Sequence, residues 1–162
     1  YPNVKSIQII FNIFRQKPAE VFFKEASKKN VAIIARVPLA SGLLTGKMNK
    51  NSSFPENDHR NYNINGDAFD VGETFSGVNY QKGLEAVEKL KQLVPVNFTL
   101  ADVALKWILM HKEISVVIPG AKNSQQARNN VKASDLNDIS NLMTSINLVY
   151  EELIKEDIHS RW

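Results

Sequence analysis

The chain has 162 residues and is 43% hydrophobic, so it is long enough to bury a core as one domain. Its formal net charge is +3, with lysine and arginine scattered rather than gathered in runs, which argues against nucleic acid and suits a small phosphate-bearing ligand. The absence of cysteine excludes disulfides and thiolate metal sites. The absence of cysteine also fits a reducing compartment, so we expect a cytoplasmic protein. No apolar run approaches the roughly 20 residues needed to span a membrane, so we expect no membrane partner.

The N-terminal part of the chain predicts a strand, a helix and a second strand. Residues 4–12 are mostly apolar, as in a parallel strand that is covered on both faces. Pro18 suits the first turn of a helix over residues 18–29, and a second strand follows at residues 31–35. This order and spacing predict a parallel βαβ unit. Gln8, inside the first apolar run, either hydrogen-bonds a neighbour or serves a ligand.

Two loop segments follow the second strand. Residues 36–47 contain Gly42 and Gly46, which let the backbone turn sharply or approach a ligand closely, so the segment is either a pyrophosphate cradle or a plain loop. Residues 48–79 are polar and long for a loop inside a compact domain, which indicates a functional lid or a disordered segment. Its aromatic side chains either wall a substrate pocket or pin the loop to the body. We favour pinning for most of them, which are Phe54, Tyr62, Phe69 and Phe75.

Three of the helices expected in the second half of the chain carry many apolar side chains. Residues 80–94 gather their apolar side chains on one side, as a surface helix does. Thr99 and Asp102 form a variant of the capping box and open a second helix that is apolar nearly all round, as expected of a helix packed against a sheet. A final amphipathic helix is predicted over residues 138–156.

Between these helices, residues 114–118 are a short apolar run that predicts a buried strand, ended by a Pro-Gly pair. Asn123 or Ser124 can cap the polar helix that follows. The first N–H groups of a helix have no internal partners and its dipole adds positive charge, so this turn, with Lys122 just before the helix, is a natural anion site. The alternative is an ordinary βα turn with polar surface side chains.

Three stretches resemble the aldo-keto reductase family, in the family's order. S-I-Q-I-I-F-N-I-F-R, at residues 6–15, is similar to its sixth strand. I-I-A-R-V-P-L-A-S-G-L-L-T-G-K, at residues 33–47, is similar to its seventh strand and the following loop. I-P-G-A-K-N, at residues 118–123, is similar to the turn after its eighth strand. The resemblance runs over nearly the whole chain and implies an α/β fold, the C-terminal part of a (β/α)8 TIM barrel that is incomplete in this chain.

The resemblance also implies a domain organisation and a cofactor. Residues 1–162 are expected to form a single partial domain, with a lid-like loop over 48–79 and the C-terminal helix over 138–156. In the family the turn after the eighth strand meets the 2′-phosphate of NADP, and a basic group there favours NADP over NAD. The implied cofactor-binding residues are Gln8, Arg36, Pro38, Leu39, Ser41, Lys47, Arg60, Gly120, Ala121, Lys122, Asn123, Gln126, Asn129 and Asn130.

Several of these residues carry a particular implied role. Gln8 is expected to bind the nicotinamide carboxamide, and Arg60 to reach the phosphates, with a solvated arginine near His59 as the alternative. Arg36 departs from the family pattern, in which many members stack an aromatic residue on the nicotinamide ring. A guanidinium can stack on a planar ring, but its charge is unfavourable beside an oxidised, cationic nicotinamide.

The resemblance implies that the intact protein reduces a small-molecule carbonyl substrate, an aldehyde or ketone, to an alcohol with NADPH. The family's catalytic Asp, Tyr, Lys and His lie on its first four strands, so we name no catalytic residue here and expect this chain alone to be inactive. The chain begins without methionine, and three parallel strands cannot close a barrel. We therefore expect the missing N-terminal barrel half, or an associating chain, as a partner. The alternatives are a non-catalytic, cofactor-sensing or regulatory subunit of the same fold, and another (β/α)8 enzyme that binds a phosphorylated ligand.

Overall fold

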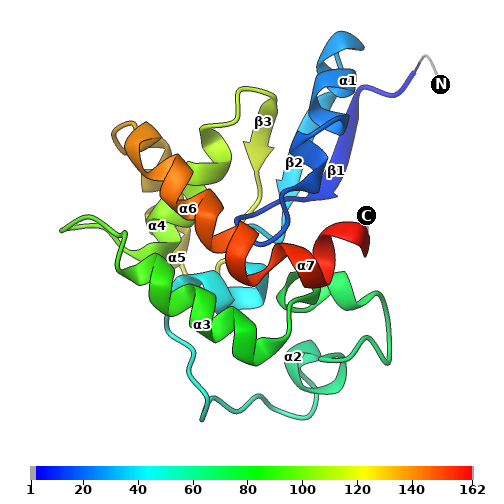
Figure 1. The fold of residues 1–162 in the computed structure, drawn as a ribbon. Coiled ribbons are helices and arrows are strands. Elements are labelled where there is room, and N and C mark those ends of the chain that lie inside the picture. Colours follow the sequence, from blue (N-terminus) through cyan, green and yellow to red (C-terminus); the bar gives the residue numbers. More distant parts are fainter. Residues whose placement is uncertain (1–2, 162) are drawn as a thin grey trace.

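The computed structural model describes residues 3–161, which contain a sheet of three parallel strands in the order β1-β2-β3. In Figure 1 the three strands point in the same direction, toward the part of the molecule where residues 48–79 lie. The predicted strands are confirmed, each within two residues of its expected start. They are β1 (Ser6–Ile10), β2 (Ala32–Arg36) and β3 (Ile114–Val117).

The sheet is covered unevenly. On the middle strand, β2, Ile33 and Ala35 are fully buried. On β3, Val116 is 43% exposed, so the prediction of a buried strand is wrong for part of β3. The apolar run specified a strand, but within residues 3–161 no further strand pairs with its outer edge.

Helices pack beside the sheet and around the ends of its strands (Figure 1). α1 connects β1 to β2, so the predicted βαβ unit is confirmed, and α3 and α6 pack against each other. The predicted final helix is interrupted at Ile154 and forms two helices, α6 and α7. The helices are α1 (Phe22–Lys28), α2 (His59–Tyr62), α3 (Tyr80–Lys91), α4 (Leu100–Leu109), α5 (Ser124–Lys132), α6 (Ser140–Leu153) and α7 (Lys155–Ile158).

The helix starts follow from their capping residues. Thr99 Oγ1 accepts a hydrogen bond from Asp102 N at 3.1 Å, and Asp102 Oδ2 accepts one from Thr99 N at 2.8 Å, so the predicted capping box opens α4. Asn123 caps α5, because its Oδ1 accepts a hydrogen bond from Gln126 N at 2.9 Å. Pro18 lies in a short 3₁₀ turn, and the α-helix predicted from it begins later, at Phe22.

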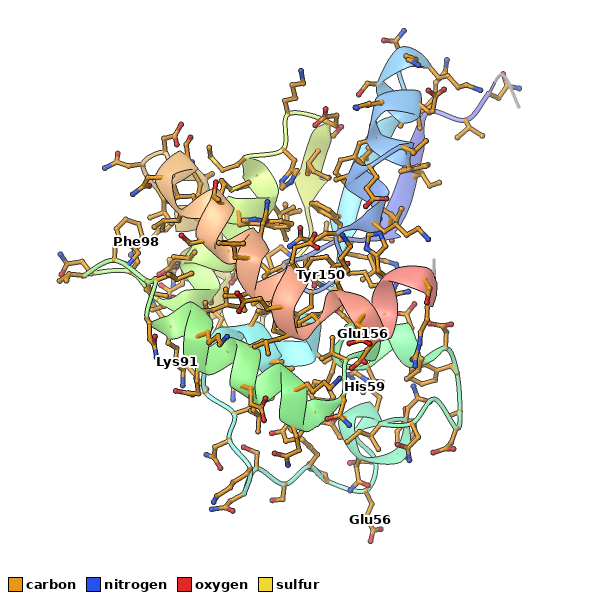
Figure 2. The ribbon with its side chains drawn as sticks, in the orientation of Figure 1. Glu56, His59, Lys91, Phe98, Tyr150 and Glu156 are labelled. Atoms are coloured by element: carbon orange, nitrogen blue, oxygen red, sulfur yellow. The ribbon has the colours of Figure 1, made fainter. Side chains whose placement is uncertain are left out.

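An aromatic cluster fixes the strands relative to the helices. Phe11, just after β1, packs on Trp107 of α4 with ring centroids 5.1 Å apart and on Phe23 of α1 at 4.7 Å. Burial of each such side chain contributes roughly 1.5–3 kcal/mol. On α6, Tyr150 (labelled in Figure 2) is also buried, and its hydroxyl lies 2.7 Å from His159 Nδ1. The C-terminal ends of the strands are therefore held against a rigid core.

The helices of residues 3–161 are too short or too polar to cross a lipid bilayer.

Candidate functional site

A cavity of about 1380 Å³ lies at the C-terminal ends of β2 and β3. Its walls come from the loop after β2, the lid-like loop (residues 48–79), the start of α4 and the face of α5. This is the edge at which parallel α/β proteins bind their ligands. Nine of the fourteen predicted cofactor-binding residues line this one cavity, namely Pro38, Leu39, Ser41, Lys47, Arg60, Gly120, Gln126, Asn129 and Asn130.

The loop after β2 has an unusual backbone. Val37, Ala40 and Ser41 have φ values of 52°, 47° and 54°, in the left-handed region that non-glycine residues rarely adopt. Each such residue costs of order 1 kcal/mol, so the surroundings must hold it in place. Ser41 Oγ does this by donating a hydrogen bond to Glu73 O at 3.1 Å and accepting one from Phe75 N at 3.1 Å. The cavity wall is thus fastened to the lid-like loop.

Gly42 continues this wall at a φ of 94°. A Cβ at Gly42 would lie 2.9 Å from Met48 Cε, the end of a flexible side chain that can shift, so the backbone conformation is the main reason for a glycine here. The same Cβ position lies 3.9 Å from Arg60 Nη1, which places the Arg60 guanidinium over this turn.

Arg60 is held by Asp58 at the start of α2. Asp58 Oδ1 accepts hydrogen bonds from Arg60 N and Nε, both at 2.9 Å, and Asp58 Oδ2 accepts one from Nη2 at 2.6 Å. The Arg60 side chain, followed by its backbone N–H, lowers the pKa of Asp58 to about 2. Arg60 lines the cavity, but its charge is largely compensated by Asp58, whereas Lys47 at the same cavity has no ion pair within residues 3–161.

The lid-like loop is anchored by buried polar side chains rather than disordered. Asn12 Nδ2 donates hydrogen bonds to Ser76 Oγ at 2.7 Å and to Val37 O at 2.8 Å. The side chains of Asn12 and Ser76 are fully buried. Arg15 Nη1 donates to Ser76 O at 3.0 Å. The far end of the loop is therefore tied to the end of β1 and to the cavity wall at once.

The four aromatic side chains of the lid-like loop divide into two pairs. Phe75 is buried in the core, and Phe54 packs against it with ring centroids 5.9 Å apart, so this pair pins the loop. Tyr62 and Phe69 are more than 40% exposed and line the cavity. Near them, His59 Nδ1 lies 3.1 Å from Thr74 Oγ1 (His59 is labelled in Figure 2).

The turn between β3 and α5 is shaped by its own side chains. Lys122 N donates to Gln126 Oε1 at 2.8 Å, and Asn130 Nδ2 donates to Gly120 O at 3.1 Å. A Cβ at Gly120 would meet no heavy atom within 4 Å, so the space beside this backbone is open to a ligand. With the N-terminus of α5 close by, the turn has the donors and the room that a phosphate group needs.

Arg36 makes a two-pronged ion pair with the lid-like loop. Its Nη1 and Nη2 donate to Glu73 Oε2 and Oε1, each at 2.5 Å, and these hydrogen bonds to Glu73 raise the pKa of Arg36. Glu73 lines the cavity, whereas its partner Arg36 is not part of the cavity wall.

Five predicted residues lie outside the wall of the cavity. Arg36 is one of them. Gln8 is exposed in the middle of β1, and Ala121, Lys122 and Asn123 are exposed beside Gly120. Their roles toward a cofactor stay predictions.

Several wall residues were not among the predicted cofactor-binding residues. They include His59, Glu73, Asn97, Asp102 and Lys132. Lys132 could have been found, because it follows Gln126 and Asn129 at intervals of three residues and so shares their face of α5. Asn97 and Glu73 gave no such signal, since long-range folding brings them to the cavity.

Parallel strands joined by helices, with a large cavity at the C-terminal ends of the strands, are the arrangement of part of a (β/α)8 barrel. The chain belongs to the aldo/keto reductase family, whose profile matches residues 1–146. The structure is similar to the glycerol dehydrogenase AKR11B4 from Gluconobacter oxydans, with a TM-score of 0.69 and 23% identity over 94% of this chain and 43% of that chain. The fold is therefore an incomplete (β/α)8 barrel, as predicted.

Two relatives bear on the cofactor and the function. The aldo-keto reductase yakc of Schizosaccharomyces pombe, whose name carries the label NADP(+), is 28% identical over 83% of this chain and 39% of its own length. A probable voltage-gated potassium channel subunit beta of Arabidopsis thaliana is 30% identical over 78% of this chain and 37% of its own length. The chain thus spans about two-fifths of the proteins that it matches.

Proposed function

We propose that this chain binds NADP in the cavity at the strand ends, and that the intact protein reduces an aldehyde or ketone to an alcohol with NADPH. The observation that supports this most is that residues far apart in the sequence, from Pro38 to Asn130, line one cavity in the positions that the family resemblance implies. At about 1380 Å³ the cavity exceeds the ~300–1,000 Å³ usual for a single small ligand, so it has room for a dinucleotide and a substrate.

The residues present suit the cofactor's charge. The turn at Gly120 offers open space and backbone donors for a 2′-phosphate, with the Lys122 ammonium beside it. Lys47 and Arg60, near the glycine turn of the loop after β2, suit a pyrophosphate. The bound cofactor would supply the hydride, while these side chains hold and orient it.

Titration of the full-length protein with NADPH and NADH tests the proposal. We expect NADPH to bind more tightly, and Lys122→Glu to weaken NADPH binding by about tenfold or more while leaving NADH binding nearly unchanged. Lys24→Glu is the matched control, because Lys24 is an exposed lysine on α1, which contributes nothing to the cavity wall. An unchanged preference between the two cofactors in Lys122→Glu would make the 2′-phosphate assignment wrong.

Catalysis should require chain outside residues 3–161. We expect carbonyl reduction by the full-length protein and none by the 162-residue chain alone, because the catalytic Asp, Tyr, Lys and His that the family resemblance implies lie on the first four strands of the barrel, before the part that this chain resembles. Turnover of an aldehyde by the purified chain would contradict this.

The completing partner should pair with the outer strands of the sheet. Val4, Ile7, Val116 and Ile118 are exposed on or beside β1 and β3, and Ile7 and Ile9 line a groove of about 370 Å³ with α1. We propose that a missing barrel half, or an associating chain, covers these edges, and that the complete protein acts in the cytoplasm. Hydrogen exchange should then be fast in β1 of the isolated chain and slow in the full-length protein.

A regulatory, cofactor-sensing subunit is the second candidate. It is favoured by the similarity to the Arabidopsis channel subunit and by Arg36, which is engaged with Glu73 instead of presenting an aromatic ring. Detectable reduction of aldehydes by the full-length protein would favour the reductase, and tight NADPH binding without turnover would favour the regulatory subunit.

A further inference from the structure

Four charged side chains meet where the lid-like loop crosses the end of β2. Arg36 pairs with Glu73 through two hydrogen bonds of 2.5 Å, and the two side chains are 33% and 32% exposed. Arg15 interacts electrostatically with Asp70 and Glu73, and Asp70 also interacts with Arg36. Two guanidinium groups thus face two carboxylates, so these four charges sum to zero, with Arg161 as a further cation near Arg15.

This group lies at one end of the cavity. Glu73 and Val37 line the cavity, and Val37 O accepts a hydrogen bond from Asn12 Nδ2, so this end is next to the end of β1. Gly120 and Asn130, by contrast, line the cavity after β3. Because β2 lies between β1 and β3, Glu73 and Gly120 are on opposite sides of the cavity.

This inference rests on the proposed function. If the adenosine end of the cofactor lies at α5, the nicotinamide end reaches the side of the cavity where Glu73 lies. The nicotinamide ring is the part of the cofactor whose charge changes in the reaction, since it is cationic when oxidised and neutral when reduced. The local charge of the protein at this end therefore acts on one redox form and not on the other.

We propose that Glu73 determines the balance between NADP+ and NADPH binding, by cancelling the charge of Arg36 beside the nicotinamide. Arg36 cannot lose its proton at any ordinary pH, so its charge can be offset by a partner and by nothing else. With Glu73 in place the cavity end is neutral and accepts both forms of the cofactor. Without the carboxylate, a net positive charge remains and repels the oxidised ring, while the reduced ring is unaffected.

The test measures dissociation constants of NADP+ and NADPH with the full-length protein, by titration of NADPH fluorescence and by competition. We expect the ratio of the NADP+ constant to the NADPH constant to rise about fivefold to tenfold in Glu73→Gln, which removes the charge and keeps the shape. Arg36→Met leaves the Glu73 carboxylate without its arginine partner, so a negative charge remains, and it should lower the same ratio by a similar factor. The double variant is neutral again and should return close to the wild-type ratio.

Asp157→Asn is the matched control. Asp157 pairs with Lys82 at 2.7 Å and is 33% exposed, so it resembles Glu73 in burial and pairing. Unlike Glu73, Asp157 and its partner Lys82 do not line the cavity. Its replacement should leave the ratio unchanged. If Glu73→Gln fails to fold, Arg36→Met carries the test through the opposite shift.

The outcomes separate the two proposals. Binding of both cofactor forms with the same ratio in the wild type, Glu73→Gln and Arg36→Met would overturn the role of Glu73 and leave the proposed function standing. Failure of the wild-type protein to bind either form would overturn both.

Discussion

The two sides of the cavity are built in opposite ways. On the side of β1, the lid-like loop is fastened by Asn12 and Ser76, which are fully buried and hydrogen-bonded to each other. On the side of β3, no residue of α5 is buried, and the turn before it is held by hydrogen bonds between exposed groups, such as Lys122 N to Gln126 Oε1. Water can replace an exposed hydrogen bond but cannot reach a buried one. Substitutions on the first side should therefore cost stability, and substitutions on the second should mainly affect a ligand.

The largest effect is expected for Asn12→Ala. Asn12 donates to Ser76 Oγ and Val37 O and accepts from Phe14 N at 2.9 Å, so its loss leaves the buried Ser76 Oγ and Phe14 N without this partner, whereas Val37 O still accepts from Ala40 N at 3.1 Å. The free energy of unfolding should fall by about 3 kcal/mol, measured by urea denaturation. The matched variant Asn129→Ala, on exposed α5, should change it by less than about 0.5 kcal/mol. Equal losses in the two variants would contradict the contrast between the two sides.

The exposed side was much easier to predict from the sequence than the buried side. The turn at residues 118–123 and the cap of α5 are local features, because Asn123 bonds a residue only three positions away. The anchor of the lid-like loop joins Asn12 to Ser76 across 64 residues, and no local pattern reports such a contact. The positions of the strands and helices could be predicted from the periodicity of apolar residues. The partial exposure of Val116 could not, because the burial of a strand depends on which other elements pack against it.

His111 illustrates how tertiary packing overrides a local expectation. At the C-terminal end of α4 a cationic imidazole would interact favourably with the helix dipole. In the structure the ring packs against Phe11 and Trp107 with centroids 4.9 Å and 4.6 Å away, and burial lowers the pKa of His111. Its Nδ1 donates to Trp107 O at 3.0 Å, so the neutral imidazole is satisfied within the core.

A smaller but more selective effect is expected from two glycines on the cavity wall. Gly42→Ala should lower the free energy of unfolding by about 2 kcal/mol, because the left-handed backbone opposes a Cβ, while the flexible end of Met48 can shift away. Gly120→Ala meets open space and should leave stability unchanged within about 0.5 kcal/mol. If a phosphate approaches this backbone closely, the added methyl group should weaken NADPH binding. Unfolding curves and NADPH titrations on both variants measure the two effects, and normal binding by Gly120→Ala would argue against a ligand at that turn.

The smallest expected effect is a pH dependence at the start of α2, on the lid-like loop. The pKa of Asp58 is about 2 in the folded protein, lowered from an ordinary 3.8 by the side chain and then the backbone of Arg60. A lowered folded-state pKa means that the carboxylate contributes stability above about pH 4, and that this contribution is lost as the pH falls through 2. After allowance for solvent screening it amounts to about 1 kcal/mol.

Asp58→Asn measures this contribution directly. The difference in the free energy of unfolding between the wild type and Asp58→Asn should be about 1 kcal/mol at pH 7 and should shrink steadily below pH 4. Arg60→Gln removes the main cause of the lowered pKa, so most of this pH dependence should disappear when the same pair is compared in that background. A difference that stays constant down to pH 2 would show that the Asp58–Arg60 pair does not stabilise the lid-like loop. The loop would then be held by the buried anchor at Asn12 and Ser76 and by the contacts of Ser41 and Arg36 with Glu73, which sharpens the contrast between the two sides of the cavity.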